Sequence, residues 1–127
     1  MDAELRIAVC RLVAGLVVSD DDFSPEEEEF IGRILKRFAI DDRQIIFPIV
    51  DRSEAAAAVH ALPAAVQEEA LAVLIEAAIA DGKVVDEERV YLRVVGEAMG
   101  LAAGVVDARV DSALAAPPPD PAGKVAG

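Results

Sequence analysis

Two stretches of the chain decide its fold: SDDDFSPEEEEFI at residues 19–31 and ADGKVVDEERVYL at residues 80–92. Their leading aspartates, Asp20 and Asp81, stand 61 positions apart. In each stretch an apolar residue follows the aspartate by three positions and a glutamate follows it by seven. Each stretch also comes after an apolar segment and before an amphipathic one. The sequence therefore predicts two related helix–acidic turn–helix units.

The segments around these turns have helical patterns. Apolar residues cover most of the circumference at residues 5–18 and 64–80, as in buried helices. Ser24 as N-cap, Pro25 at the first position and Glu27 in a capping box begin a helix that extends to residue 38. Further helices are expected at residues 42–47 before Pro48, at 53–62 capped by Ser53, from residue 86 or 87 to residue 99 before Gly100, and at 102–114.

No segment shows the alternation of a half-buried strand over a useful length. The fold class is therefore predicted as all-α, a compact bundle of about seven helices. A chain of 127 residues fits one domain, which we place at residues 1–115. The proline-rich segment at residues 116–127 cannot continue a helix, so we expect a flexible tail there.

The composition limits the partners. A net charge of −12 repels phosphate backbones and anionic lipids, so we expect no nucleic-acid and no membrane partner. Cations or basic protein surfaces are the natural electrostatic partners, and a protein partner or a homo-oligomer is expected. The single cysteine, Cys10, allows no disulfide within the chain, and residues 1–4 lack the basic region of a secretory signal. Both observations favour a cytoplasmic location.

The acidic turns are the candidate ligand sites. Five carboxylates fall within the eight residues 20–27, and the second turn has a similar group. Hard cations such as Ca²⁺ or Mg²⁺ prefer oxygen ligands, and such a divalent cation is the one cofactor that the sequence suggests. The alternative is that these carboxylates only cap helices, and the spacing does not fit an EF-hand. The candidate metal ligands are Asp20, Asp22, Glu27, Asp81 and Glu88.

A family resemblance rests on the same residues. The stretch AAIADGKV at residues 77–84, followed by DEER at residues 86–89, resembles the signature of the TerB-like (tellurite-resistance protein B) superfamily. The stretch at residues 19–38 is similar to a degenerate copy. The resemblance implies a bundle of about seven helices, a link to tellurite resistance or stress response, and divalent-cation binding by the acidic residues.

The residues carried over from that pattern are Asp20, Phe23, Ser24 and Glu27 in the first copy and Asp81, Gly82, Val84 and Glu88 in the second. The chain departs from the pattern at two positions. Asp21 stands where the family usually has glycine, which predicts a different backbone geometry in that turn. Val85 stands where a capping residue is common, so we expect the helix cap to shift to Asp86.

Four single residues outside the acidic turns also bear on function. His60 has only apolar neighbours and is interpreted as a partly exposed helix-end residue, and Cys10 as a buried small hydrophobic residue. Glu76 either points outward or supports Asp81, and the outward position is favoured. Tyr91 aligns with Phe30 in the repeat, which predicts a core position.

No phosphate-binding loop, no Ser/His/Asp set and no zinc-ligand spacing occurs, so we predict a protein that is not an enzyme. The first functional hypothesis is a cytoplasmic TerB-like module that binds a divalent cation or docks a basic partner through its acidic turns. The alternative is an assembly protein that oligomerises, or docks another protein, through an apolar helix face without metal. The broad apolar surfaces of residues 5–18 and 64–80 motivate this alternative.

Overall fold

Six α-helices and no strand make up the part of the chain that the computed structural model describes, residues 2–18, 25–41, 49–80 and 82–115. In chain order they are α1 (Ala3–Val17), α2 (Pro25–Arg37), α3 (Arg52–His60), α4 (Ala64–Ala78), α5 (Asp86–Ala98) and α6 (Ala103–Ala115). The all-α class is confirmed. The seventh helix expected at residues 42–47 and the tail expected at residues 116–127 lie outside the described residues. Within those residues, no helix is both long and apolar enough to cross a membrane.

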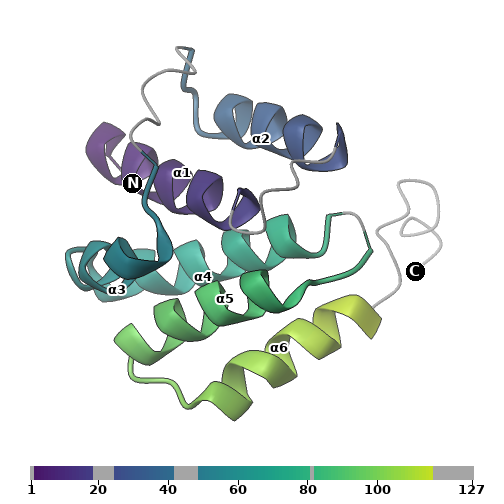
Figure 1. Cartoon of the computed structure of the whole chain (residues 1–127). Helices are drawn as coiled ribbons and strands as arrows, with labels where there is room; N and C mark the ends of the chain where they lie inside the picture. The colour runs from purple at the N-terminus through teal and green to yellow at the C-terminus, as the bar shows by residue number, and fades with distance from the viewer. Residues whose placement is uncertain (1, 19–24, 42–48, 81, 116–127) are drawn as a thin grey trace, which may run out of the picture.

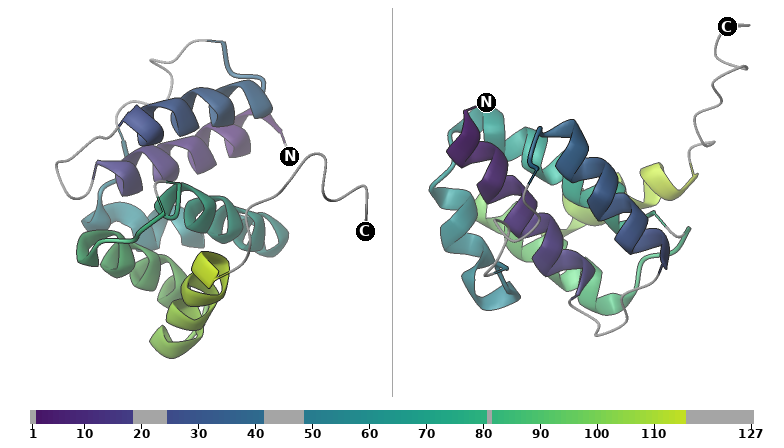
Figure 2. Two further views of the ribbon diagram at one scale, coloured as in Figure 1. Left: turned by 90° about the vertical axis from the view of Figure 1, so that its right-hand side faces the viewer. Right: turned by 90° about the horizontal axis from the view of Figure 1, so that it is seen from above.

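The helices pack around α4 and α5 (Figure 1). α1 packs against α4, and α2 contacts both of them. α3 lies against α5 and α1, whereas α6 lies against α5 and α4 on the side of the bundle away from α2 (Figure 2). Fully buried aliphatic side chains such as Leu12 and Leu16 on α1 and Leu71 and Leu74 on α4 form the centre of the core. The broad apolar surfaces of α1 and α4 are therefore largely used inside the bundle.

The offset of 61 residues that relates the two acidic stretches also relates the helices. α1 and α4 each have 15 residues, α2 and α5 each have 13, and both pairs begin 61 positions apart. Their contacts are reciprocal. α1 packs on α2 as α4 packs on α5, and α1 touches α5 as α4 touches α2. Exchanging the two helix pairs therefore leaves the pattern of contacts unchanged.

Buried positions follow the same offset. Phe30 and Ile31 on α2 are buried, as are Tyr91 and Leu92 at the corresponding positions of α5. The core position predicted for Tyr91 is confirmed, because its side chain is completely inaccessible to solvent. The residue patterns of α2 and α5 thus direct the same face of each helix into the core.

The ends of α2 and α5 also correspond. Both helices are followed by a residue in the left-handed conformation: Ala39, with φ of 57°, and Gly100, with φ of 88°. One residue further on, Ile40 and Leu101 each donate a backbone hydrogen bond of 2.8 Å to a carbonyl five positions earlier. This is the Schellman arrangement, in which glycine is the preferred left-handed residue. The helix stop predicted at Gly100 is confirmed, whereas Ala39 occupies the same conformation with a β-carbon.

The start of α3 differs from the prediction. The N-cap is Asp51 and not Ser53, and the helix begins one residue earlier than predicted, at Arg52. Asp51 Oδ1 accepts a hydrogen bond of 3.1 Å from the backbone N–H of Glu54, and the Glu54 side chain accepts from the Asp51 N–H at 3.5 Å. The capping box thus gives a hydrogen-bond acceptor to two backbone N–H groups at the helix start, whereas a serine cap alone would give one to a single N–H. This explains why the helix begins after Asp51.

α6 is attached to α5 by close packing and by charge. A β-carbon built at Gly96 would lie 2.2 Å from a methyl carbon of Val106, so only glycine allows this approach. The Arg93 guanidinium donates to both carboxylate oxygens of Asp107, at 3.1 and 2.9 Å. This paired interaction lowers the pKa of Asp107. The close packing and the ion pair together hold α6 against the side of α5 that faces away from α2.

Candidate functional site

The structure describes only part of the predicted metal site. Asp20, Asp22 and Asp81 lie outside the described residues, as does the side chain of Glu27. Glu88 is the candidate ligand whose side chain is described. Within the described ranges, no three histidine, cysteine, aspartate or glutamate side chains are grouped so that they could hold a metal ion. The described residues thus provide no cation-binding set of their own.

Glu88 lies in the first turn of α5, where it is only 3% exposed. Its Oε1 accepts a hydrogen bond of 3.2 Å from the backbone N–H of Val85, the N-cap residue of the helix. The cap predicted at Asp86 is therefore wrong, because Asp86 is the first residue of the helix proper. Valine has no side-chain acceptor, so the carboxylate of Glu88 provides the side-chain contribution to this helix start.

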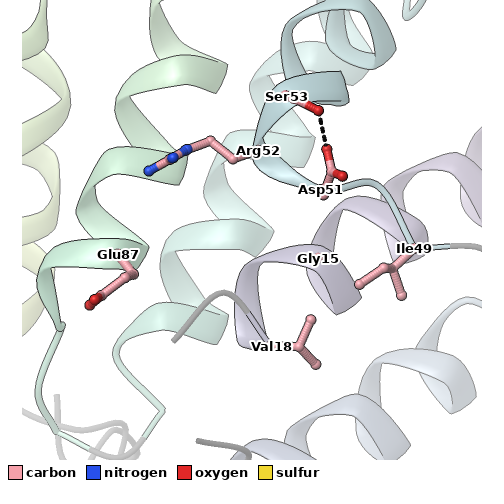
Figure 3. A pocket seen from close by; sticks show the side chains of 7 residues that line it. All are labelled: Gly15, Val18, Ile49, Asp51, Arg52, Ser53 and Glu87. Atoms are coloured by element: carbon pink, nitrogen blue, oxygen red, sulfur yellow. Dashed lines mark hydrogen bonds between the residues drawn. The ribbon is translucent and has the colours of Figure 1, made fainter. Parts of the chain in front are cut away.

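A hollow of about 600 Å³ with a charged rim and a more apolar lining lies between the end of α1, the segment that leads into α3 with its first residues, and the first turn of α5 (Figure 3). The residues that line it are Gly15, Val18, Ile49, Asp51, Arg52, Ser53 and Glu87. Three of them are apolar or lack a side chain, and four carry a charge or a hydroxyl group. We call this feature the polar hollow.

The wall of the polar hollow is fixed by the peptide group of Val50. Its N–H donates a hydrogen bond of 3.2 Å to the Arg11 carbonyl on α1, and its carbonyl accepts one of 2.5 Å from the phenol of Tyr91 on α5. A β-carbon at Gly15 would lie 1.8 Å from the Val50 oxygen and 2.7 Å from the Tyr91 oxygen. Gly15 is therefore required for α1, the segment before α3 and α5 to meet here.

Tyr91 remains a neutral donor in this arrangement. Burial raises the pKa of its phenol, and the nearby negative charges of Asp51 and Glu54 raise it further. The hydrogen bond to Val50 therefore persists throughout the physiological pH range. It joins α5 to the segment that carries Asp51.

Asp51 presents a fixed and ionised carboxylate at the edge of the hollow. The Ser53 hydroxyl donates a hydrogen bond of 2.6 Å to Asp51 Oδ1, and this bond is the main reason that the pKa of Asp51 is lowered. The backbone N–H groups of Glu54 and Ser53 also lower it. The carboxylate is thus charged at neutral pH and held in one orientation.

Arg52 and Glu87 complete the charged rim. Both are exposed, and Figure 3 shows the Arg52 side chain extending from the start of α3 toward α5. Neither side chain forms an ion pair with another described residue. The rim therefore presents two carboxylates and one guanidinium group that is available to a ligand.

Other residues singled out in the sequence have structural roles. Cys10 is buried as predicted, and burial raises the pKa of its thiol to about 12, so it stays protonated. His60 is the exposed last residue of α3, also as predicted. Glu76 points outward and forms an ion pair of 3.3 Å with Arg37 on α2, which confirms the favoured interpretation.

Glu87 belongs to the DEER stretch at residues 86–89 that the sequence singles out, whereas no sequence pattern assigned the other six lining residues to a shared site. A glycine inside an apolar helix, as at Gly15, is a signal of close backbone approach, and the spacing of Asp51 and Glu54 is a capping-box signal. Comparisons with models of protein families, with characterised proteins and with solved structures found no match. The TerB-like resemblance therefore remains a prediction from the motif residues.

Proposed function

We propose that the protein is a non-catalytic TerB-like module, built from two related helix–acidic turn–helix units, that binds a divalent cation through its acidic turns. The common offset of the helix pairs and their reciprocal contacts support the two related units. Following the resemblance, the proposal places the module in a cytoplasmic stress or tellurite response.

The observation that carries this proposal is that Val18 and Glu87 line the same polar hollow. Val18 is the last described residue before the first acidic turn, and Glu87 lies in the first turn of the helix that follows the second one. The chain thus brings the exit from α1 and the start of α5 to one end of the bundle. Carboxylates from both turns would supply the oxygen ligands that Ca²⁺ or Mg²⁺ needs.

In this proposal Asp20, Asp22, Glu27 and Asp81 contribute ligands. Glu88 holds the start of α5 in place, because its carboxylate is buried and bonded to Val85 N–H. A buried carboxylate that caps its own helix positions neighbouring ligands better than it reaches an ion.

The alternative of assembly through an apolar helix face has less support. The fully buried side chains of α1 and α4 are used in the core of the bundle. Among the described residues, Val105 is the only large hydrophobic residue that is exposed. The surface formed by the described residues therefore lacks the contiguous apolar patch that is typical of an obligate interface.

An amide NMR titration of the EDTA-treated protein with Ca²⁺ and Mg²⁺ at physiological salt tests the proposal. We expect saturable shifts confined to residues 20–27 and 81–88, and weaker binding in Asp81→Asn. Glu97→Gln is the matched control, since it removes an exposed carboxylate at the far end of α5. Small shifts that never saturate and spread over all carboxylates would show diffuse screening and rule out a cation site.

A further inference from the structure

We infer that the polar hollow is the docking site for a lysine or arginine side chain of a partner protein. This inference rests on the proposed function only in treating the chain as a binding module. The site shares Glu87 with the second acidic stretch, its other lining residues lie outside the acidic turns, and its ligand is a segment of protein and not a metal ion.

The lining of the hollow matches the two parts of a long basic side chain. Val18 and Ile49 are half-buried and provide apolar surface, whereas Asp51 and Glu87 present exposed carboxylates. Lysine and arginine lay an aliphatic stem on apolar surface and keep the charged head at a polar edge. An acidic side chain would be repelled by both carboxylates, and a purely apolar one would displace water from them without replacing its hydrogen bonds.

The size of the hollow also favours a side chain over an ion. A bound Ca²⁺ needs several oxygens at about 2.3–2.6 Å, all converging on one point. A space of about 600 Å³ whose described lining holds two carboxylates does not provide that convergence. It has the volume to take a long side chain and part of the backbone that carries it.

The site is held in shape before any ligand arrives. The Val50 peptide is bonded to both α1 and α5, and the Ser53 hydroxyl and the Glu54 N–H hold the Asp51 carboxylate in place. A preformed acceptor loses little side-chain freedom on binding. The net charge of −12 also attracts basic partners over a distance and raises their association rate.

Arg52 sets the selectivity of the rim. It is the one basic residue among the described residues that line the hollow. Its guanidinium group repels an incoming cation and so offsets part of the attraction of Asp51 and Glu87. Removing this charge therefore strengthens binding of a basic peptide, an effect opposite to that of removing either carboxylate.

The test is an amide NMR titration of the full chain with a capped tetralysine peptide at physiological salt, with the same peptide fully N-acetylated on its side chains as the neutral control. We expect saturable shifts at residues 15, 18, 49–53 and 87, and none with the acetylated peptide. Glu87→Gln should weaken binding about two- to fivefold, the range for an exposed ion pair, and Arg52→Gln should strengthen it. Asp51→Asn keeps a good helix cap and should weaken binding in the same way as Glu87→Gln.

Glu97→Gln separates a specific site from general attraction, since it removes the same charge from the same helix away from the hollow. If Glu97→Gln weakens binding as much as Glu87→Gln does, or if the shifts follow all acidic residues, the docking site is wrong. The cation titration above is an independent readout. Peptide binding without saturable Ca²⁺ or Mg²⁺ shifts would remove the metal from the proposed function and keep this inference, and the reverse result would do the opposite.

Discussion

Gly15 on α1 and the carbonyl of Val50 approach so closely that a β-carbon at Gly15 would stand 1.8 Å from the carbonyl oxygen. The same oxygen accepts the hydrogen bond from Tyr91, so α1, the segment before α3 and α5 converge on one atom. The polar hollow opens beside this junction, with Gly15 in its lining. The shape of the candidate site therefore depends on the absence of a side chain.

The first prediction is that Gly15→Ala lowers the free energy of unfolding by about 2 kcal/mol or more, because the backbone must move to admit the methyl group. Gly32→Ala is the matched control. Gly32 lies in the exposed interior of α2 with nothing within 4 Å of a β-carbon, so alanine there should stabilise by about 0.5–1 kcal/mol. Urea unfolding followed by circular dichroism measures both changes. Equal effects of the two variants would contradict the close approach.

The second prediction compares the ends of α2 and α5. Ala39→Gly should raise the free energy of unfolding by up to about 1 kcal/mol, because it relieves a β-carbon in the left-handed conformation. The gain is partly offset by the greater freedom of glycine in the unfolded chain. Gly100→Ala, at the position 61 residues later, should lower the free energy by about 1 kcal/mol.

Thermal and urea unfolding of the two variants provide the measurement for this second prediction. The expected changes have opposite signs at two positions with the same backbone conformation. A loss of stability in Ala39→Gly would mean that this residue does not hold a positive φ in solution.

Much of the fold follows from local patterns in the sequence. Pro25 begins α2, Gly100 follows the end of α5, and the offset between the acidic turns anticipates the common spacing of the two helix pairs. These features depend on neighbouring residues, which a sequence displays directly. The start of α3 was also predictable in principle, since Asp51 and Glu54 have capping-box spacing, but Ser53 offered a competing cap.

The polar hollow was not predictable in the same way. Its lining comes from three segments that are far apart in the chain, and hydrogen bonds of the Val50 peptide to α1 and α5 help to hold these segments together. The burial of Glu88 depends on how α5 sits in the bundle, which no local pattern determines. Side-chain chemistry identified candidate residues, whereas tertiary packing decided which of them face solvent.

The third prediction concerns pH. Burial raises the pKa of the Cys10 thiol to about 12, above its value of about 8.5 in an unfolded chain. The unfolded state therefore releases this proton first, so the stabilisation is complete below about pH 8.5 and is lost as the pH rises toward 12. The free energy of unfolding should fall by up to about 1.4 kcal/mol per pH unit within that window.

Urea unfolding at pH 8.0, 9.0 and 9.8 measures the slope, and Cys10→Ala is the control, because it should remove most of the dependence in this range. Burial also raises the pKa of Tyr91. Tyr91 contributes to the pH dependence of stability only above about pH 10, because a tyrosine in the unfolded chain ionises there. A wild-type profile as flat as that of Cys10→Ala would show that the thiol is accessible to solvent.

The fourth prediction separates a helix cap from a metal ligand at Glu88. A cap needs only a side-chain oxygen to accept the hydrogen bond from Val85 N–H, so Glu88→Gln should cost less than about 1 kcal/mol, whereas Glu88→Ala should cost about 1–3 kcal/mol. A direct carboxylate ligand of Ca²⁺ contributes its charge, so Gln as well as Ala would weaken cation binding. Unfolding in urea and the Ca²⁺ titration, applied to both variants, give the two readouts.

We expect Glu88→Gln to preserve both stability and any cation binding, because the carboxylate is only 3% exposed and bonded to the start of its own helix. A loss of binding in Glu88→Gln at unchanged stability would instead assign Glu88 to the metal.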